Sequence, residues 1–95
     1  MQISSAINEK QYLTFVYDGH VRTVEPHTFG VDKKGHSALR AYQVAGGSDS
    51  GEYVGWKLFH VDQVESIKIL PEHFSGARPS YKRNDSAFSL IYAQL

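Results

Sequence analysis

The stretch LTFVYDGHVRTVEPH, residues 13–27, decides the fold of this chain. Apolar side chains recur at every second position of its first half, which is typical of a strand with one buried face. Asp18 and Gly19 follow, and both residue types tolerate the positive φ that a two-residue type I′ turn requires. A second β-rich run begins at Val21. We therefore predict an antiparallel hairpin that founds a small β barrel.

The chain after the hairpin is predicted to add three more strands. Pro26 interrupts the second strand because proline donates no ladder hydrogen bond, so we expect a bend that carries one long strand from one side of a barrel to the other. The further strands are expected at residues 39–45, 53–61 and 64–70, with a reversal at 32–35 and a flexible loop at 46–51.

The two ends of the chain are predicted to be helical. Ile3, Ala6 and Ile7 share one face of a short amphipathic helix, which must pack on the barrel to persist. A C-terminal helix is predicted because four apolar residues near the end fall on one helical face. They are Phe88, Ile91, Tyr92 and Leu95.

These elements predict a mainly β fold, a small SH3-like or Sm-like five-stranded antiparallel barrel with a short N-terminal helix and a C-terminal helix. Five short strands that are close in sequence favour a barrel over a sandwich. The 95 residues are expected to form one domain with a single core. Its parts are the leading helix at 1–11, the barrel at 12–70 and a C-terminal extension at 71–95.

Composition narrows the class of protein. Ten basic and ten acidic residues give zero formal charge, which disfavours a nonspecific nucleic-acid binder. The absence of cysteine excludes disulfides and thiolate chemistry. No apolar run approaches the roughly 20 residues that span a bilayer. The first residues also lack the pattern of a secretory signal. We expect a soluble, cytoplasmic protein.

Five short pieces of the chain, taken in order and with their spacing, carry a family resemblance. They are residues 6–7, 15–17, 22–26, 39–42 and 59–64. On these pieces, residues 3–70 resemble the WYL domain. The resemblance implies a small SH3-like or Sm-like barrel without chemistry of its own. It also implies a regulatory role in bacterial transcription factors, phage defence or CRISPR-associated systems, through sensing of nucleotides or nucleic acid.

The chain departs from the WYL pattern at several positions. The tripeptide that names the family falls on Ser37, Ala38 and Leu39, so its two aromatic residues are missing. The family's two arginines are replaced by His60 and Gln63. Arg22 stands at its expected place.

Basic and aromatic residues of the expected strands form the predicted ligand site. Cationic groups bind phosphates and aromatic planes stack on bases, so we predict Arg22 and Lys57 as charge anchors and Trp56 as a stacking surface. His60 would be cationic only in mild acid. The alternative is that the aromatic side chains fill the core and the basic ones are merely solvated. The full predicted set is Tyr17, Arg22, Arg40, Tyr42, Trp56, Lys57 and His60.

No catalytic or metal site is predicted. No two of the five histidines have the spacing of a zinc site, and Ser48 and Ser50 lie in a flexible loop that cannot preorganise a nucleophile. Three basic residues in the C-terminal connector either bind a polyanion or keep a loop solvated. They are Arg78, Lys82 and Arg83.

Two functions remain open from the sequence. The first is a non-catalytic regulatory module that senses a negatively charged ligand, a nucleotide or single-stranded nucleic acid, without a cofactor. The second is a protein-protein interaction or dimerisation module that acts as an accessory subunit, because the edge strands of small barrels pair readily with a partner strand.

Overall fold

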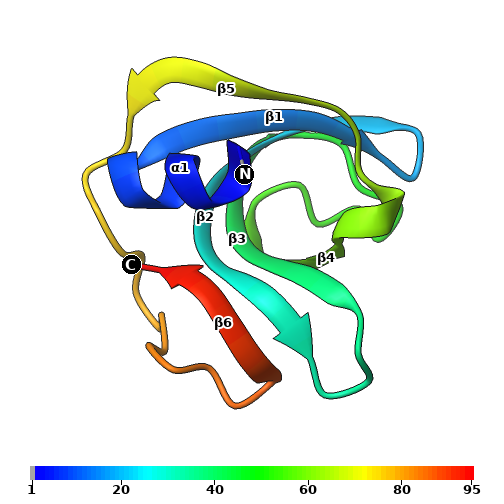
Figure 1. The fold of residues 1–95 in the computed structure, drawn as a ribbon. Coiled ribbons are helices and arrows are strands. Elements are labelled where there is room, and N and C mark those ends of the chain that lie inside the picture. The colour runs from blue at the N-terminus through cyan, green and yellow to red at the C-terminus, as the bar shows by residue number, and fades with distance from the viewer. Residues whose placement is uncertain (1) are drawn as a thin grey trace.

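One helix and six strands follow one another in the computed structural model, which describes residues 2–95 (Figure 1). Six strands against one short helix make the fold mainly β, as the sequence predicts. All the strand pairs are antiparallel. The elements are α1 (Gln2–Glu9), β1 (Gln11–Tyr17), β2 (His20–Asp32), β3 (Ser37–Gly46), β4 (Gly55–His60), the 3-10 turn η1 (Val61–Gln63), β5 (Glu65–His73) and β6 (Phe88–Gln94).

The predicted hairpin of β1 and β2 is confirmed. Tyr17 pairs with His20 across a two-residue turn, and Leu13 pairs with Val24 further along the ladder. Asp18 and Gly19 have φ of 51° and 75°, the left-handed values that a type I′ turn needs at both central positions.

β2 is the central strand of the molecule. One of its edges pairs with β3 along most of its length, while the other pairs with β1 as far as Val24 and with β6 from Thr28 onward. The ladder with β3 shifts register between Pro26 and Thr28. The predicted interruption at Pro26 is therefore a β-bulge, at the point where β2 changes partners.

The prediction of a closed, five-stranded barrel is corrected by the pairing order. The strands run β4-β3-β2-β1-β5, with β6 added on β2, so within residues 2–95 β4 and β5 are open edges. The sheet curls enough for side chains to span it, because the Tyr17 hydroxyl accepts a hydrogen bond from the His60 backbone N–H at 3.1 Å. Phe59 packs edge-on against the rings of Phe15 and Tyr17. Side chains, not ladder hydrogen bonds, connect β1 to β4.

The predicted C-terminal helix is wrong, since Phe88–Gln94 is the strand β6. β6 occupies the edge of β2 that β1 leaves free beyond Val24, with Phe29 opposite Ala93 and Val31 opposite Leu90. An unpaired stretch of a central strand would expose backbone donors and acceptors, so a strand is more stable here than a helix. Figure 1 shows β6 beside the C-terminal half of β2.

Strand ends also differ from the prediction. β4 begins at Gly55, and the preceding Tyr53 and Val54 are exposed. β5 continues past Pro71 to His73, beyond the predicted end of this strand at residue 70. Proline is tolerated because β5 is an edge strand and because its ladder with β1 is irregular at this point.

α1 covers one end of the curled sheet, as the sequence predicts. Its buried residues are Ile3, Ala6 and Ile7, which join the core formed by the strands. No helix within residues 2–95 has the length and apolar character needed to cross a membrane. The strand residues of the core are Leu13, Phe15, Val24, Phe29, Leu39, Ala41 and Phe59.

Candidate ligand-binding site

The structure separates the seven predicted site residues into three groups. Side chains alternate along a strand, so neighbours such as Trp56 and Lys57 on β4 point to opposite faces. They line two different cavities. The groups are Tyr17, Arg22 and Lys57; Arg40, Tyr42 and Trp56; and His60 alone.

Arg22 is the most unusual residue of the first group because it is a buried charge. Only 4% of its surface is exposed. Its Nε and Nη2 donate hydrogen bonds to the Tyr17 carbonyl at 3.3 and 3.2 Å, and its Nη1 donates to Gln43 Oε1 at 3.3 Å. All these acceptors are neutral. Within residues 2–95, no carboxylate forms an ion pair with Arg22.

Two aromatic rings compensate part of the Arg22 charge. Its guanidinium carbon lies 5.3 Å from the ring centre of Tyr17 and 5.5 Å from that of Phe59. Cation–π contacts of this kind are worth roughly 0.5–2 kcal/mol, which is less than the several kcal/mol that burying one ion costs. The site therefore retains an excess of positive charge at its base.

Arg22 faces a cavity of about 280 Å³ that we call the Arg22 pocket. Lys57 supplies a second cation, held by hydrogen bonds from its Nζ to the Glu52 carbonyl at 2.7 Å and to Ser48 Oγ at 3.5 Å. The lining residues are Tyr17, Asp18, Arg22, Ser48, Asp49, Ser50, Lys57, Leu58 and Phe59.

The acidic residues of the Arg22 pocket do not neutralise its base. Asp49 carries a side chain that is 71% exposed and accepts a hydrogen bond from the ring of His20 at 2.8 Å. Asp18 lies in the exposed turn of the first hairpin. Exposed carboxylates are screened by water, whereas the buried guanidinium is not, so we infer that Arg22 leaves a net positive charge at the base of the pocket.

The second group surrounds Trp56, whose indole is fixed by the protein itself. Its Nε1 donates a hydrogen bond to the Pro79 carbonyl at 3.1 Å. Its ring meets those of His27 and Tyr42 edge-on, with centroids 4.7 and 5.5 Å away, and lies nearly parallel to that of Tyr81 at 6.3 Å. These contacts give Trp56 a packing role in holding the C-terminal connector.

Arg40 is also occupied by an internal partner. Its Nε donates a hydrogen bond to Asp85 Oδ2 at 3.1 Å. Arg40 and Trp56 line a second cavity, of about 250 Å³, together with residues 80–82 and 85–86 of the connector. Because its arginine is already paired with a carboxylate, this cavity is a weaker anion site than the Arg22 pocket.

Sequence reasoning missed a polar cluster at the β2 bulge. Glu25 is buried and accepts two hydrogen bonds from Arg78, at 2.7 and 2.9 Å. That hydrogen bonding raises the pKa of Arg78. The Arg78 guanidinium also lies 4.5 Å from the ring centre of Tyr42. Arg78 therefore has a structural role: it holds the connector against Glu25. By sequence alone it falls into a basic cluster with Lys82 and Arg83.

His27 completes the cluster as a neutral imidazole. Its Nδ1 donates to the Glu25 carbonyl at 2.8 Å, so its Nε2 must accept the hydrogen bond from the Arg78 backbone N–H at 3.1 Å. Burial lowers the pKa of His27. In the sequence His27 directly follows Pro26, but nothing local revealed that it is buried or which groups it contacts.

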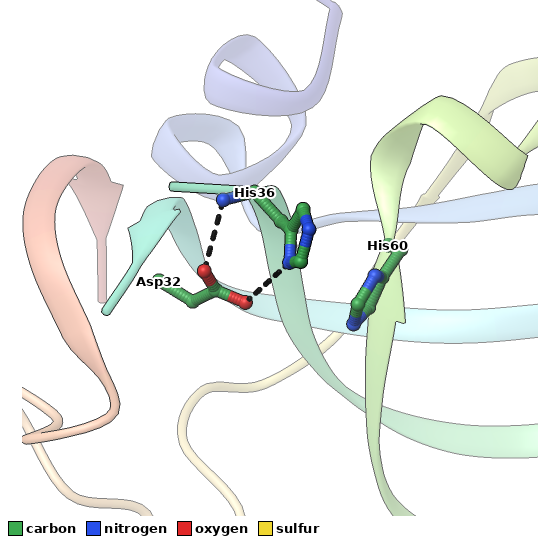
Figure 2. Close-up of side chains that lie close together, drawn as sticks. All are labelled: Asp32, His36 and His60. Atoms are coloured by element: carbon green, nitrogen blue, oxygen red, sulfur yellow. Dashed lines mark hydrogen bonds and ion pairs between the residues drawn. The ribbon is translucent and has the colours of Figure 1, made fainter. Parts of the chain in front are cut away.

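His60 lies beside two residues that the sequence did not single out, Asp32 and His36 (Figure 2). The backbone N–H groups of Lys34 and His36 both donate to Asp32 Oδ1 at 2.9 Å. The hydrogen bond from the His36 N–H contributes most to lowering the pKa of Asp32. Asp32 is therefore an ionised carboxylate that organises the turn between β2 and β3.

Comparison with protein-family models, curated proteins and solved structures finds no match for this chain. The resemblance to the WYL domain therefore stays a prediction from the sequence. The chemistry of the Arg22 pocket follows from the residues of this chain and does not depend on a family assignment.

Proposed function

We propose that this domain is a non-catalytic regulatory module that senses a small negatively charged ligand, of which a phosphate group or a nucleotide is the best fit, in the Arg22 pocket. The single observation that carries the proposal is the buried guanidinium of Arg22, which has only neutral partners within residues 2–95. Bacterial transcription regulation or phage defence is the setting that the WYL resemblance implies.

Electrostatics support an anionic ligand. A buried cation without a carboxylate partner lowers the stability of the folded protein, and an anion that binds next to it restores the missing compensation. Guanidinium groups match the oxygen geometry of phosphates, and hydrogen bonds between charged groups are about twice as strong as neutral ones. Lys57, together with the hydroxyls of Ser48 and Ser50, offers further contacts.

The size of the pocket favours a small ligand. Its volume of about 280 Å³ is near the lower limit of roughly 300 Å³ for sites of drug-sized molecules. A phosphate with part of a nucleoside fits this volume. Trp56 lies in the other cavity, so the predicted pairing of Arg22 with a Trp56 stacking platform in one site is not supported.

The proposal is tested by calorimetric titration at low salt with inorganic phosphate, a mononucleotide, a cyclic dinucleotide and a short single-stranded DNA. We expect saturable, one-to-one binding by at least one phosphate ligand, weakened by added salt. Arg22→Met should lower the affinity at least tenfold, because a hydrogen bond to a charged group contributes roughly 1.5–3 kcal/mol.

Two further variants distinguish loss of the site from loss of the fold. Lys57→Gln should weaken binding less than Arg22→Met, because Lys57 is only partly buried. Arg40→Met is the matched control, since Arg40 belongs to the other cavity and is paired with Asp85. Circular dichroism checks that each variant is folded. Unchanged affinity in a folded Arg22→Met protein, or no binding by any of the four ligands, would refute the proposal.

The alternative function, a protein-protein interaction or dimerisation module, is supported by β6. Leu90 and Tyr92 lie two residues apart on this strand, and each is 53% exposed. Within residues 2–95, β6 pairs only with β2, so its other edge is free to accept a partner strand. Sedimentation velocity over a range of concentrations tests this function, and Leu90→Lys should abolish any dimer it detects.

A further inference from the structure

Three side chains from separate parts of the chain converge at one edge of the sheet (Figure 2). Asp32 ends β2, His36 lies in the turn that follows it, and His60 ends β4. Each offers one potential ligand atom, and these atoms all lie within 4.8 Å of one another. Imidazole nitrogens and a carboxylate oxygen are the ligands that zinc and related metals bind in proteins.

The spacing of two of these atoms already suits a bound metal. Asp32 Oδ2 and His36 Nδ1 are 3.4 Å apart. Two ligands at about 2.1 Å from a tetrahedral zinc ion are separated by about 3.4 Å, so a metal can bridge this pair with little rearrangement. We propose that Asp32, His36 and His60 form a binding site for a divalent transition metal of the zinc class.

The carboxylate is oriented before any metal binds. Its Oδ1 accepts the two backbone hydrogen bonds of the turn, from Lys34 and His36, which leaves Oδ2 directed at the imidazoles. The turn itself is closed by a 2.8 Å hydrogen bond from the Asp32 backbone N–H to the His36 carbonyl. Ser89 from β6 donates a further hydrogen bond to the Asp32 carbonyl at 3.1 Å. Metal ligands held in this way lose little freedom on binding.

Pairing of β3 with β4 supplies the third ligand. Ala38 lies opposite His60 in that ladder, and His36 is two residues before Ala38. The rings of His36 and His60 have centroids 5.0 Å apart. Within residues 2–95, the ring nitrogens of His60 form no hydrogen bond, so both remain available to a metal.

The ligand set determines the kind of ion. Two imidazoles and one carboxylate suit zinc, copper, nickel or cobalt, whereas calcium and magnesium require a site built of oxygen ligands. Three protein ligands leave the fourth tetrahedral position open for water or an exogenous group. This inference does not rest on the Arg22 pocket, which shares no residue with the three ligands, although the pocket residue Tyr17 accepts a hydrogen bond from the His60 backbone N–H.

The ordinary explanation of Asp32 and His36 is a simple ion pair, and the chain contains a second one, whose carboxylate is more exposed. His20 and Asp49 form the same kind of pair at 2.8 Å. Within residues 2–95, no third histidine, cysteine or carboxylate joins that pair to form a three-ligand group. If one histidine and one carboxylate were enough to bind the metal, the His20–Asp49 pair would bind it as well as the Asp32–His36 pair does.

The test uses untagged protein and two probes. Calorimetry with zinc measures affinity and stoichiometry, and cobalt reports tetrahedral coordination through its visible absorption. We expect one ion per chain. Free zinc at ten times the dissociation constant should raise Tm by roughly 5–10 °C. In NMR spectra, the imidazole signals of His36 and His60 should move on adding zinc, while those of His20 should not.

Four variants decide the assignment. His36→Gln and His60→Gln should each weaken zinc binding by about tenfold or more and abolish the cobalt spectrum. Asp32→Asn keeps an acceptor for the turn but removes the charge, so it should weaken binding without unfolding the protein. His20→Gln should bind zinc like the original chain. The proposal is overturned if no saturable binding occurs, or if folded His36→Gln and His60→Gln bind as well as His20→Gln does.

Discussion

Glu25 and Arg78 show how one pair of residues can hold a long connector in place. The Glu25 side chain is only 3% exposed, and Arg78 reaches it from the segment between β5 and β6 with two hydrogen bonds. A buried carboxylate that loses its partner is costly, more so than the pair itself is favourable. The stability of the connector therefore depends on Arg78.

Replacing Arg78 with glutamine should lower the free energy of unfolding by roughly 2–3 kcal/mol, which is less than the loss for a fully buried pair because the Arg78 side chain is 40% exposed. Urea unfolding measures the change. Arg83→Gln is the control, since Arg83 is exposed and, among the described residues 2–95, its side chain donates only to the Leu95 carbonyl. Adding Glu25→Gln to Arg78→Gln should recover part of the loss, and equal effects of the two arginine variants would contradict this account.

His27 makes the stability of the fold depend on pH in mild acid. Burial lowers its pKa below the ordinary value of 6.5, so between the two values the unfolded chain binds a proton that the folded protein does not. The free energy of unfolding should therefore not depend on His27 above about pH 6.5. It should fall as the pH is lowered from that value toward and through the pKa of His27 in the folded state. The carboxyl of Asp32 titrates in a lower window, below its ordinary value of 3.8.

Urea unfolding at several pH values between 7.5 and 5 measures this dependence, and an NMR titration of the His27 ring reports its pKa directly. His27→Gln removes the titrating group, so its stability should vary less over the same range even if it starts lower. A His27 ring that titrates above pH 6.5 in the folded protein would show that the imidazole is stabilised as a cation, contrary to its hydrogen bonds.

At the scale of elements, the contact between β2 and β6 depends on one glycine. A Cβ built at Gly30 would lie 2.0 Å from the Leu90 carbonyl oxygen and 2.9 Å from the Ile91 Cα. Both are backbone atoms of β6, and they cannot move aside unless the strand moves. Only glycine allows the two strands to approach this closely.

Gly30→Ala should therefore destabilise the protein by about 1–3 kcal/mol, the usual cost of overpacking. Hydrogen exchange should also accelerate in β6 and in the facing half of β2, while the β1–β2 hairpin should change little. Gly47→Ala is a suitable comparison because the atoms nearest to its added methyl group belong to the side chain of His20 and not to the backbone. If both substitutions cost the same, close approach of β6 is not the reason for Gly30.

At the scale of the whole molecule, the curl of one sheet decides which side chains meet. β1 and β4 are not hydrogen-bonded neighbours, yet Tyr17 reaches His60, and Phe59 reaches Phe15. The same curl buries Arg22 beneath aromatic rings and opens the Arg22 pocket beside it. The proposed metal site forms where β2, the following turn and β4 come together.

This arrangement predicts how the two proposed sites behave toward each other. They share no residue, so zinc at Asp32, His36 and His60 should not compete with a phosphate ligand for protein groups. Each ligand should therefore still raise Tm when the other is bound, although Tyr17 of the Arg22 pocket accepts a hydrogen bond from the His60 backbone N–H. Differential scanning calorimetry with each ligand and with both measures this, and competition between them would place both ligands in one site.

The separation of the predicted ligand-site residues into two cavities could have been predicted from strand alternation. Trp56 and Lys57 are adjacent on a strand, so the sequence already implied opposite faces, and treating them as one surface was the error. Asp32 and His36 are four residues apart across a turn, a pair that the sequence prediction passed over. The third ligand, His60, becomes a neighbour only through the register of β3 with β4.

The C-terminal segment shows why local patterns were insufficient there. Phe88, Ile91 and Tyr92 fit a helical face, but Phe88, Leu90 and Tyr92 fit strand alternation equally well. Local propensity could not choose between them. The choice came from β2, whose free edge beyond the Pro26 bulge needed a hydrogen-bonded partner.

The sequence by itself determined the β1–β2 hairpin, the bulge at Pro26 and the buried face of α1. The hairpin depends on the backbone freedom of Asp18 and Gly19, the bulge on the N–H that Pro26 lacks, and the buried face of α1 on the helical spacing of its apolar residues. Each of these causes acts within a few residues. Only the tertiary structure decided that β6 is a strand and that Arg22 is buried without a carboxylate. Strand pairing and burial depend on groups far apart in the chain, so their free energies are defined only once the sheet has formed.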